Sequence, residues 1–146
     1  MDIGVGRLPV KSAEEARVVV NKLIRYDTDA KRFGRWRKDI VFVADDGSLS
    51  DGFTSIHQSQ ANQLAENIEI SYPWHNTRKL FLGVYQKNVT PNGESVPKAN
   101  EDLINEFNRS VIINYTGHGA EKLWADERIL TESAIASLTN ESSPIV

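Results

Sequence analysis

A histidine stands between two glycines where an apolar run ends: residues 111–115, VIINY, are followed by Thr116, Gly117, His118 and Gly119. A glycine before the histidine allows the chain to turn sharply off the run. A glycine after it leaves a backbone N–H that a substrate can approach with no side chain in the way. A histidine beside such a donor is half of an acyl-transfer site, because it supplies a general acid or base next to one oxyanion donor. The tripeptide alone also fits a loop histidine that only hydrogen-bonds its neighbours.

The other two histidines are weaker candidates for chemistry. His57 stands near the start of a predicted helix and fits a cap-region or surface group, and His75 lies in the aromatic loop YPWHNTR. The spacing of the three histidines matches no common metal-ligand pattern, and the chain has no cysteine. Residues 45–55, DDGSLSDGFTS, loosely suggest calcium, but the glycine falls at the wrong place for an EF-hand loop. We therefore expect a polar turn there and predict no metal and no cofactor.

The composition is that of one globular domain: 146 residues, 40% hydrophobic and 25% charged. A net charge of -3 predicts no nucleic-acid partner. The basic stretch 29–39, DAKRFGRWRKD, fits a solvated loop or short helix better than an anion contact, because no second basic cluster supports it. The sequence shows no membrane span and no signal-peptide pattern. Both ends run directly into strand-like segments, so we expect a piece of a longer protein.

Strand and helix patterns alternate along the chain. The predicted strands cover residues 2–8, 40–44, 79–82 and 111–115, with a further strand beginning at 144–146. The predicted helices cover residues 12–26, 56–69 and about 99–107, with a short last helix from the cap Thr131 to Leu138. Residues 86–98 are predicted to form a loop because of their prolines and glycine. This alternation predicts an α/β fold with a mostly parallel sheet and helices on both faces.

In such a sheet, functional groups collect at the carboxyl ends of the strands. Two predicted strand ends carry suitable chemistry: Asp45-Asp46-Gly47 after the first buried strand, and Gly117-His118-Gly119 after the last. We expect both turns at the same edge of the sheet. His118 should lie in a loop at the end of a central strand, with at least one ring nitrogen open to solvent.

Several segments together resemble one known family. VIINYTGHGAEKLWADE, with its apolar strand, NYTGHG, and then Glu and Trp, resembles the first catalytic block of the gingipain-like cysteine peptidases. DIGVGRLP with the acidic helix after it, and GRWRKDIVFVADDG, are similar to earlier parts of that family. The segments NTRKLFLGVYQK and WADERIL are most similar to the sortase branch that serves the type nine secretion system. The resemblance implies a caspase-like α/β/α sandwich, with residues 1–146 as part of the catalytic subdomain.

The resemblance also implies a role for individual residues. His118 matches the catalytic histidine, and the N–H of Gly119 matches a donor of the oxyanion hole. Thr116 matches a wall of the pocket for the substrate residue before the scissile bond. Asp46 falls where the family carries an acid that orients the histidine, within direct or one-water reach, and Asp45 is close enough to compete for that role. No acid aligns with the position that selects arginine in gingipains, so no arginine preference is implied.

The departure from the family is the missing nucleophile. In the family, a further apolar strand ends in a cysteine, whereas this chain has no cysteine and stops at SSPIV. We therefore expect these 146 residues by themselves to be inactive, as the histidine half of a dyad. The resemblance implies a peptide or protein substrate, other secretion components as partners, and a location outside the cell or on the bacterial outer-membrane surface. There the sortase would cleave C-terminal signals from secreted cargo.

Two other functions stay open from the sequence. The first is a non-catalytic module with this fold that binds a peptide or acts as a scaffold in a secretion assembly. The second is a small α/β phosphate binder, which the sequence disfavours because it lacks a Gly-rich strand-to-helix loop of the right form.

Overall fold

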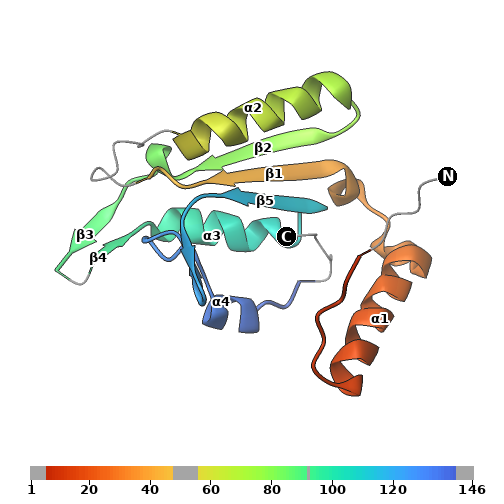
Figure 1. Ribbon diagram of the computed structural model, residues 1–146. Coiled ribbons are helices and arrows are strands. Elements are labelled where there is room, and N and C mark those ends of the chain that lie inside the picture. Colours follow the sequence, from red (N-terminus) through yellow and green to blue (C-terminus); the bar gives the residue numbers. More distant parts are fainter. Residues whose placement is uncertain (1–5, 48–55, 92, 141–146) are drawn as a thin grey trace. The chain divides into compact units, whose positions relative to one another are not determined.

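The computed structural model describes residues 6–47, 56–91 and 93–140, and the chain divides into two compact units, Met1–Gly34 and Arg35–Val146 (Figure 1). The first unit contains helix α1 (Ala13–Thr28) and a 3₁₀ turn, Ala30–Arg32. The strand predicted over residues 2–8 is wrong for residues 6–8, which have no regular structure, and its other residues lie outside the described ranges. The described part of this unit holds no other strand that could supply ladder hydrogen bonds.

Helix α1 begins at the predicted cap. The side chain of Ser12 accepts a hydrogen bond from the backbone N–H of Glu15, at 3.1 Å. The Glu15 carboxylate reaches back to the N–H of Lys11, at 2.7 Å. The first bond satisfies a backbone donor that the first helical turn leaves without a partner, and the second ties the preceding residue to the helix, so the capping signal in the sequence is confirmed.

The second unit is built on a sheet of three parallel strands, in the order β2-β1-β5 (Figure 1). Its strands are β1 (Asp39–Ala44), β2 (Asn76–Phe81) and β5 (Ile112–Thr116). The middle strand, β1, is buried along its whole length. The predicted parallel sheet is therefore confirmed, although β5 is an edge strand of the described sheet and not a central one.

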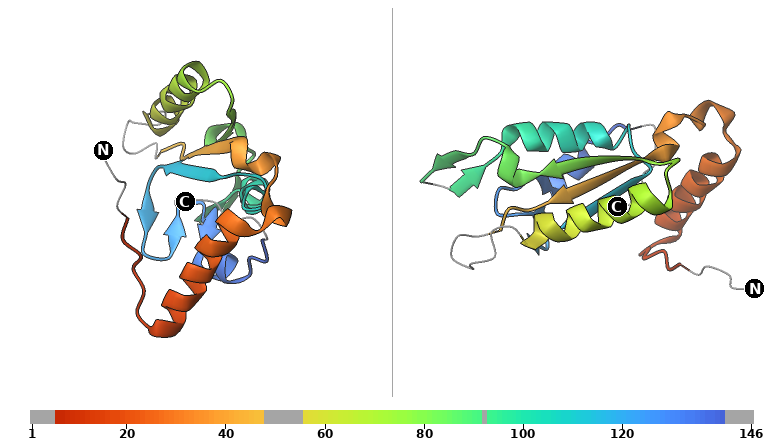
Figure 2. Two further views of the ribbon diagram at one scale, coloured as in Figure 1. Left: turned by 90° about the vertical axis from the view of Figure 1, so that its right-hand side faces the viewer. Right: turned by 90° about the horizontal axis from the view of Figure 1, so that it is seen from above.

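Helices cover both faces of this sheet, as Figures 1 and 2 show: α2 (Ile56–Ser71) on one side and α3 (Pro97–Glu106) on the other. Successive side chains of β1 point to opposite faces of the sheet, as strand geometry requires. One core cluster joins Ile40, Phe42 and Ala44 of β1 to Ala61 and Ala65 of α2. The other joins Val41 and Val43 of β1 to Ala99 and Leu103 of α3. Burial on both faces explains why this strand is continuously apolar.

Short strands appear where the sequence predicted none. The predicted loop 86–98 contains a hairpin of β3 (Asn88–Thr90) and β4 (Gly93–Ser95). A small antiparallel sheet follows β5, formed by β6 (Gly119–Ala120), β7 (Leu123–Trp124) and β8 (Leu130–Thr131). Strands of two or three residues are too short to show an alternating pattern, so the sequence could not reveal them.

The last described helix is α4 (Glu132–Ala136), which Thr131 caps as predicted by accepting from the N–H of Ala134, at 3.2 Å. The strand predicted at residues 144–146 lies outside the described residues. Within the described ranges, no helix has both the length and the apolar character that a membrane crossing needs.

Arg78 holds together the amino-terminal end of the sheet. Its guanidinium, on β2, lies 2.9 Å from the Asp39 carboxylate on β1 and 2.5 Å from the Glu106 carboxylate on α3. It also donates to the carbonyl of Arg109, at 2.9 Å, and to the hydroxyl of Ser110, at 3.1 Å, both just before β5. The two acids are largely buried, so each depends on this cation for its charge balance.

Removing the guanidinium should therefore destabilise the fold. We expect Arg78→Ala to lower the free energy of unfolding by about 3 kcal/mol, because it leaves two buried carboxylates unpaired. Arg78→Lys should fall between it and the wild type, since an ammonium keeps the charge but not the fork of donors. Urea unfolding followed by circular dichroism measures both values.

The control is Lys79→Ala, on the next residue. The Lys79 ammonium is exposed and donates to Asn62, at 2.8 Å, so its loss should change stability by no more than about 0.5 kcal/mol. Equal effects of the two alanine variants would show that the Arg78 network does not stabilise the sheet.

Candidate active site

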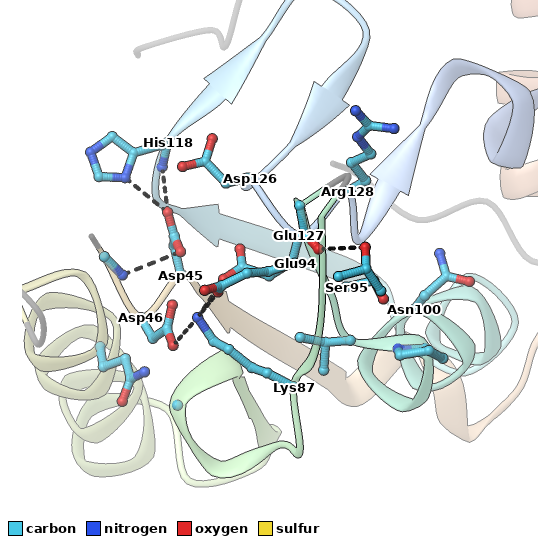
Figure 3. A pocket seen from close by; sticks show the side chains of 17 residues that line it. Asp45, Asp46, Lys87, Glu94, Ser95, Asn100, His118, Asp126, Glu127 and Arg128 are labelled. Atoms are coloured by element: carbon cyan, nitrogen blue, oxygen red, sulfur yellow. Dashed lines mark hydrogen bonds and ion pairs between the residues drawn. The ribbon is translucent and has the colours of Figure 1, made fainter. Parts of the chain in front are cut away.

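His118 lies directly after β5, at the carboxyl end of the sheet (Figure 3). Its side chain is 50% exposed, so solvent reaches the ring as predicted. The ring nitrogen Nδ1 lies 2.9 Å from Oδ2 of Asp45. The backbone N–H of His118 donates to the same oxygen, at 3.1 Å. The turns after β1 and β5 therefore meet at one edge of the sheet, as the sequence predicted.

Asp45, and not Asp46, is the carboxylate that contacts the imidazole. The N–H of Asp45 donates to the carbonyl of Thr116, at 3.1 Å, and so extends the pairing of β1 with β5 by one residue. Because side chains alternate along a strand, Asp45 shares a face with Val41 and Val43, and the next residue turns to the other side. Asp46 forms an ion pair with Lys87, at 2.9 Å. The strand pairing therefore corrects the expectation for Asp46: the carboxylate bonded to the imidazole of His118 is that of Asp45.

The Asp45 carboxylate is held in its charged form. Burial by itself raises the pKa of this carboxyl group. Hydrogen bonds from the backbone and ring of His118 and from the N–H of Gly47, at 3.2 Å, nevertheless hold the pKa below its usual value. An ionised carboxylate can only accept hydrogen bonds, so Nδ1 of His118 must carry the proton. Nε2 is then the ring nitrogen available for proton transfer.

Two aromatic residues that sequence reasoning missed support the histidine turn. The hydroxyl of Tyr115 donates to the carbonyl of His118, at 2.5 Å. The N–H of Ala125 donates to the same carbonyl, at 2.9 Å. The ring of Tyr115 stacks on that of Trp124, with centroids 4.5 Å apart and planes 7° from parallel. The tryptophan that follows NYTGHG, Trp124, was the one signal in the sequence for this support.

The two glycines around His118 differ in what they allow. A Cβ on Gly117 would overlap Cβ of Asp45 and the phenol of Tyr115, so only glycine fits between them. A Cβ on Gly119 would meet only the carbonyl of Leu123, at 3.4 Å, which is an ordinary contact. Gly117 is therefore required by close approach, and Gly119 is not.

The backbone N–H of Gly119 points away from the neighbouring strand. Gly119 pairs with Trp124 across the antiparallel strands β6 and β7. Because the N–H of Ala125 donates to the carbonyl of His118, this is a non-hydrogen-bonded pair, whose own N–H groups face outward. An outward N–H is compatible with the oxyanion role of Gly119, which stays a prediction. Thr116 ends β5 opposite Ala44 and is not among the residues that line the adjacent pocket, so its role as a pocket wall stays a prediction.

A pocket of about 1150 Å³ opens beside His118 and Asp45 (Figure 3). Its walls come from the turn after β1, the β3–β4 hairpin, the start of α3 and residues 126–128. Five carboxylates and two cations line it: Asp45, Asp46, Glu94, Asp126 and Glu127, with Lys87 and Arg128. This excess of negative charge favours basic over acidic groups of a ligand.

Lys87 is the charged centre of this pocket. Its ammonium lies 2.9 Å from Asp46, 2.9 Å from Glu94 and 2.6 Å from Glu127. Burial by itself lowers the pKa of Lys87, but hydrogen bonds to the three carboxylates raise the pKa well above its usual value. Lys87 therefore stays charged and joins the β3–β4 hairpin to both walls of the pocket.

The other histidines have separate positions. The ring of His57, at the start of α2, lies edge-on to the ring of His118, with centroids 4.8 Å apart and planes at 90°. Nδ1 of His75 lies 3.1 Å from the carbonyl of Lys38, at the amino-terminal end of the sheet. The structure therefore brings two of the three histidines together, which their spacing in the sequence did not predict.

Comparison with known proteins identifies one family. The model of peptidase family C25 matches residues 1–146. Gingipain R2 of Porphyromonas gingivalis is 22% identical over 142 residues, which cover 97% of this chain and 17% of the relative. Gingipain R1 of the same species is also 22% identical over 97% of this chain, and 13% of that relative is covered. The chain thus spans less than a fifth of these relatives. No solved structure gives a significant match.

The fold agrees with this family. A parallel sheet between helices, in a mixed α/β chain, is consistent with the caspase-like α/β fold predicted from the sequence.

The contrast between the two glycines can be tested directly. We expect Gly117→Ala to lower the free energy of unfolding by about 1–3 kcal/mol, because the added methyl group displaces Asp45 or Tyr115. Gly119→Ala should stay within about 0.5 kcal/mol of the wild type. Thermal and urea unfolding measure both. Equal losses of unfolding free energy in Gly117→Ala and Gly119→Ala would contradict the packing described around Gly117.

Stability should also depend on the charge of Asp45. The pKa of Asp45 is lower in the folded state than its ordinary value of 3.8. The charged carboxylate therefore adds to the free energy of unfolding above pH 3.8, and this stabilisation is lost as the pH falls through the lower pKa of the folded state. We expect Asp45→Asn to be less stable than the wild type at pH 7. The gap between the two should narrow below pH 3.8, in urea unfolding measured from pH 7 to pH 2.

The matched control is Asp126→Asn, an exposed carboxylate of the same pocket. Its loss should change stability at pH 7 by no more than about 0.5 kcal/mol. A stability gap for Asp45→Asn that stays constant down to pH 2 would mean that hydrogen bonds to the charged carboxylate do not stabilise the fold.

Proposed function

Because the chain belongs to peptidase family C25, we propose that it carries the histidine half of the active site of a cysteine endopeptidase. The observation that carries the proposal is the hydrogen bond from Nδ1 of His118 to the buried carboxylate of Asp45. It gives a solvent-exposed imidazole a fixed orientation beside a large pocket. A histidine, an acid that orients it and an adjacent outward N–H are what acyl transfer to a thiol requires.

The proposed reaction begins with a cysteine thiol, which gives its proton to Nε2 of His118. The thiolate then attacks the carbonyl carbon of the substrate peptide, and the N–H of Gly119 helps to hold the oxyanion that forms. As this intermediate collapses, the C–N bond breaks and Nε2–H of His118 protonates the leaving amine. A water molecule next attacks the thioester carbonyl carbon while Nε2 takes its proton. The C–S bond then breaks, the acid product leaves, and Nε2–H returns the proton to the thiolate. Asp45 keeps Nδ1 protonated throughout.

These 146 residues contain no cysteine. We therefore propose that the thiol comes from residues outside this sequence, and that the 146-residue chain by itself has no peptidase activity. It should also fail to react with thiol-directed probes, since it has no thiolate.

The sortase role is the finer part of the proposal. It rests on the resemblance of residues 76–87 and 124–130 to the sortase branch of the type nine secretion system. These two segments meet in the pocket, where the Lys87 ammonium contacts Glu127, at 2.6 Å. A protein of this kind would cleave C-terminal signals from secreted cargo, outside the cell or at the outer-membrane surface, with other secretion components as partners.

The complete protein tests these roles. We expect His118→Ala to abolish turnover of a peptide substrate. Asp45→Asn should lower kcat/KM on the order of 10²-fold or more, because the imidazole loses the acceptor that sets its tautomer. Asp46→Asn should cost much less, since this acid contacts Lys87 and not the ring. A larger loss of kcat/KM for Asp46→Asn than for Asp45→Asn would show that Asp46, and not Asp45, orients the histidine.

Labelling by an acyloxymethyl ketone probe separates an enzyme from a binding module. Labelling of the complete protein should require both its cysteine and His118. Normal turnover of His118→Ala would show that the histidine is structural. A well-folded complete protein that shows neither labelling nor turnover would favour the alternative, a non-catalytic peptide-binding or scaffolding module.

A further inference from the structure

We propose that Asp45, His57 and His118 form a reversible binding site for a divalent transition-metal ion, of which Zn²⁺ is the best match. One carboxylate oxygen of Asp45 and one ring nitrogen of each histidine all lie within 4.8 Å of one another. The three residues come from the end of β1, the start of α2 and the turn after β5. No spacing in the sequence joins them, so only the folded chain reveals the group.

The chemistry of the three side chains selects the metal. Imidazole nitrogen and carboxylate oxygen are ordinary zinc ligands, and three protein ligands with one open position is a common zinc arrangement. A second group, Asp45 with Asp46 and Glu127, offers oxygen atoms alone. The Lys87 ammonium already contacts Asp46 and Glu127, at 2.9 and 2.6 Å, and offsets part of their charge. The group with two histidines is therefore the one suited to a transition metal.

His57 supplies an independent observation. Its Nδ1 is buried and finds no hydrogen-bond partner in the part of the chain that the structure describes. A buried polar atom without a partner is costly, and such groups in native proteins call for an explanation. Its ring nevertheless lies against the ring of His118, at 4.8 Å between centroids. A metal ion shared by the two rings would explain why His57 stands here without a hydrogen bond at Nδ1.

The geometry requires only small side-chain movements. Ligand atoms of a tetrahedral zinc ion lie about 3.3 Å apart, given Zn–N and Zn–O distances of about 2.0 Å. Atoms that now lie within 4.8 Å must therefore draw together by about 1.5 Å at most. The side chain of His118 is 50% exposed, so solvent and not packed protein surrounds about half of it. Asp45 is fixed by the N–H groups of His118 and Gly47, so it would act as the anchor of the site.

The consequence of binding rests on the proposed function. An ion held by Asp45 and His118 occupies both the orienting acid and the general acid or base. Zinc would then act as a reversible inhibitor of the peptidase, which is a regulatory role and not that of a cofactor.

The test measures zinc binding to the complete protein after treatment with a chelator, by titration calorimetry with zinc chloride. Visible absorption with cobalt chloride reports the ligand set independently. We expect His57→Gln and His57→Ala to raise the Kd for zinc by about tenfold or more, as the loss of a ligand should. His75→Ala should bind like the wild type, because His75 contacts Lys38 at the opposite end of the sheet.

Unfolding temperatures without metal establish that each variant is folded. Equal zinc affinity in the wild type, both His57 variants and His75→Ala would overturn the site, as would a wild type that binds no zinc. Failure of the proposed peptidase function would appear as absent turnover and would leave the binding result unaffected. Zinc that binds through His57 but leaves turnover unchanged would overturn the inhibitory role alone.

Discussion

The hydrogen bond between the imidazole of His118 and the buried carboxylate of Asp45 is the interaction on which the rest of the site depends. The carboxylate is 5% exposed, and such a charge persists only where hydrogen bonds replace its lost water. Its donors are the ring and backbone of His118, 73 residues away, and the N–H of Gly47. Parallel pairing of β1 with β5 brings them together, so the tautomer of the histidine follows from the register of two strands.

At each end of the sheet, one cation forms ion pairs with carboxylates that are partly or largely buried. At the amino-terminal end, Arg78 contacts Asp39 and Glu106, and its other donors bond to Arg109 and Ser110. At the carboxyl end, the Lys87 ammonium contacts three carboxylates that line a pocket of about 1150 Å³. Each cation offsets the cost of burying acids. The second network lines this pocket, whereas Arg78, Asp39 and Glu106 are not among its lining residues.

The larger elements could be predicted because each repeats a pattern over several residues. The apolar run of β1 and the cap of α1 at Ser12 are examples. The β3–β4 hairpin and the small sheet β6–β8 could not, since strands of two or three residues carry no period. The strand predicted over residues 2–8 was wrong for residues 6–8, because a short apolar segment does not by itself specify a partner strand.

The sequence by itself determined that a histidine between two glycines ends an apolar strand, that an acidic turn ends another, and that no cysteine is present. Parallel strands then required the two turns to share one edge of the sheet. Only the tertiary structure decided that Asp45 and not Asp46 meets His118, and that His57 lies against the same ring. The physical reason is that these contacts depend on strand register, side-chain alternation and helix packing. Those properties depend on pairs of segments that are distant in the sequence, so the sequence of one segment alone does not reveal them.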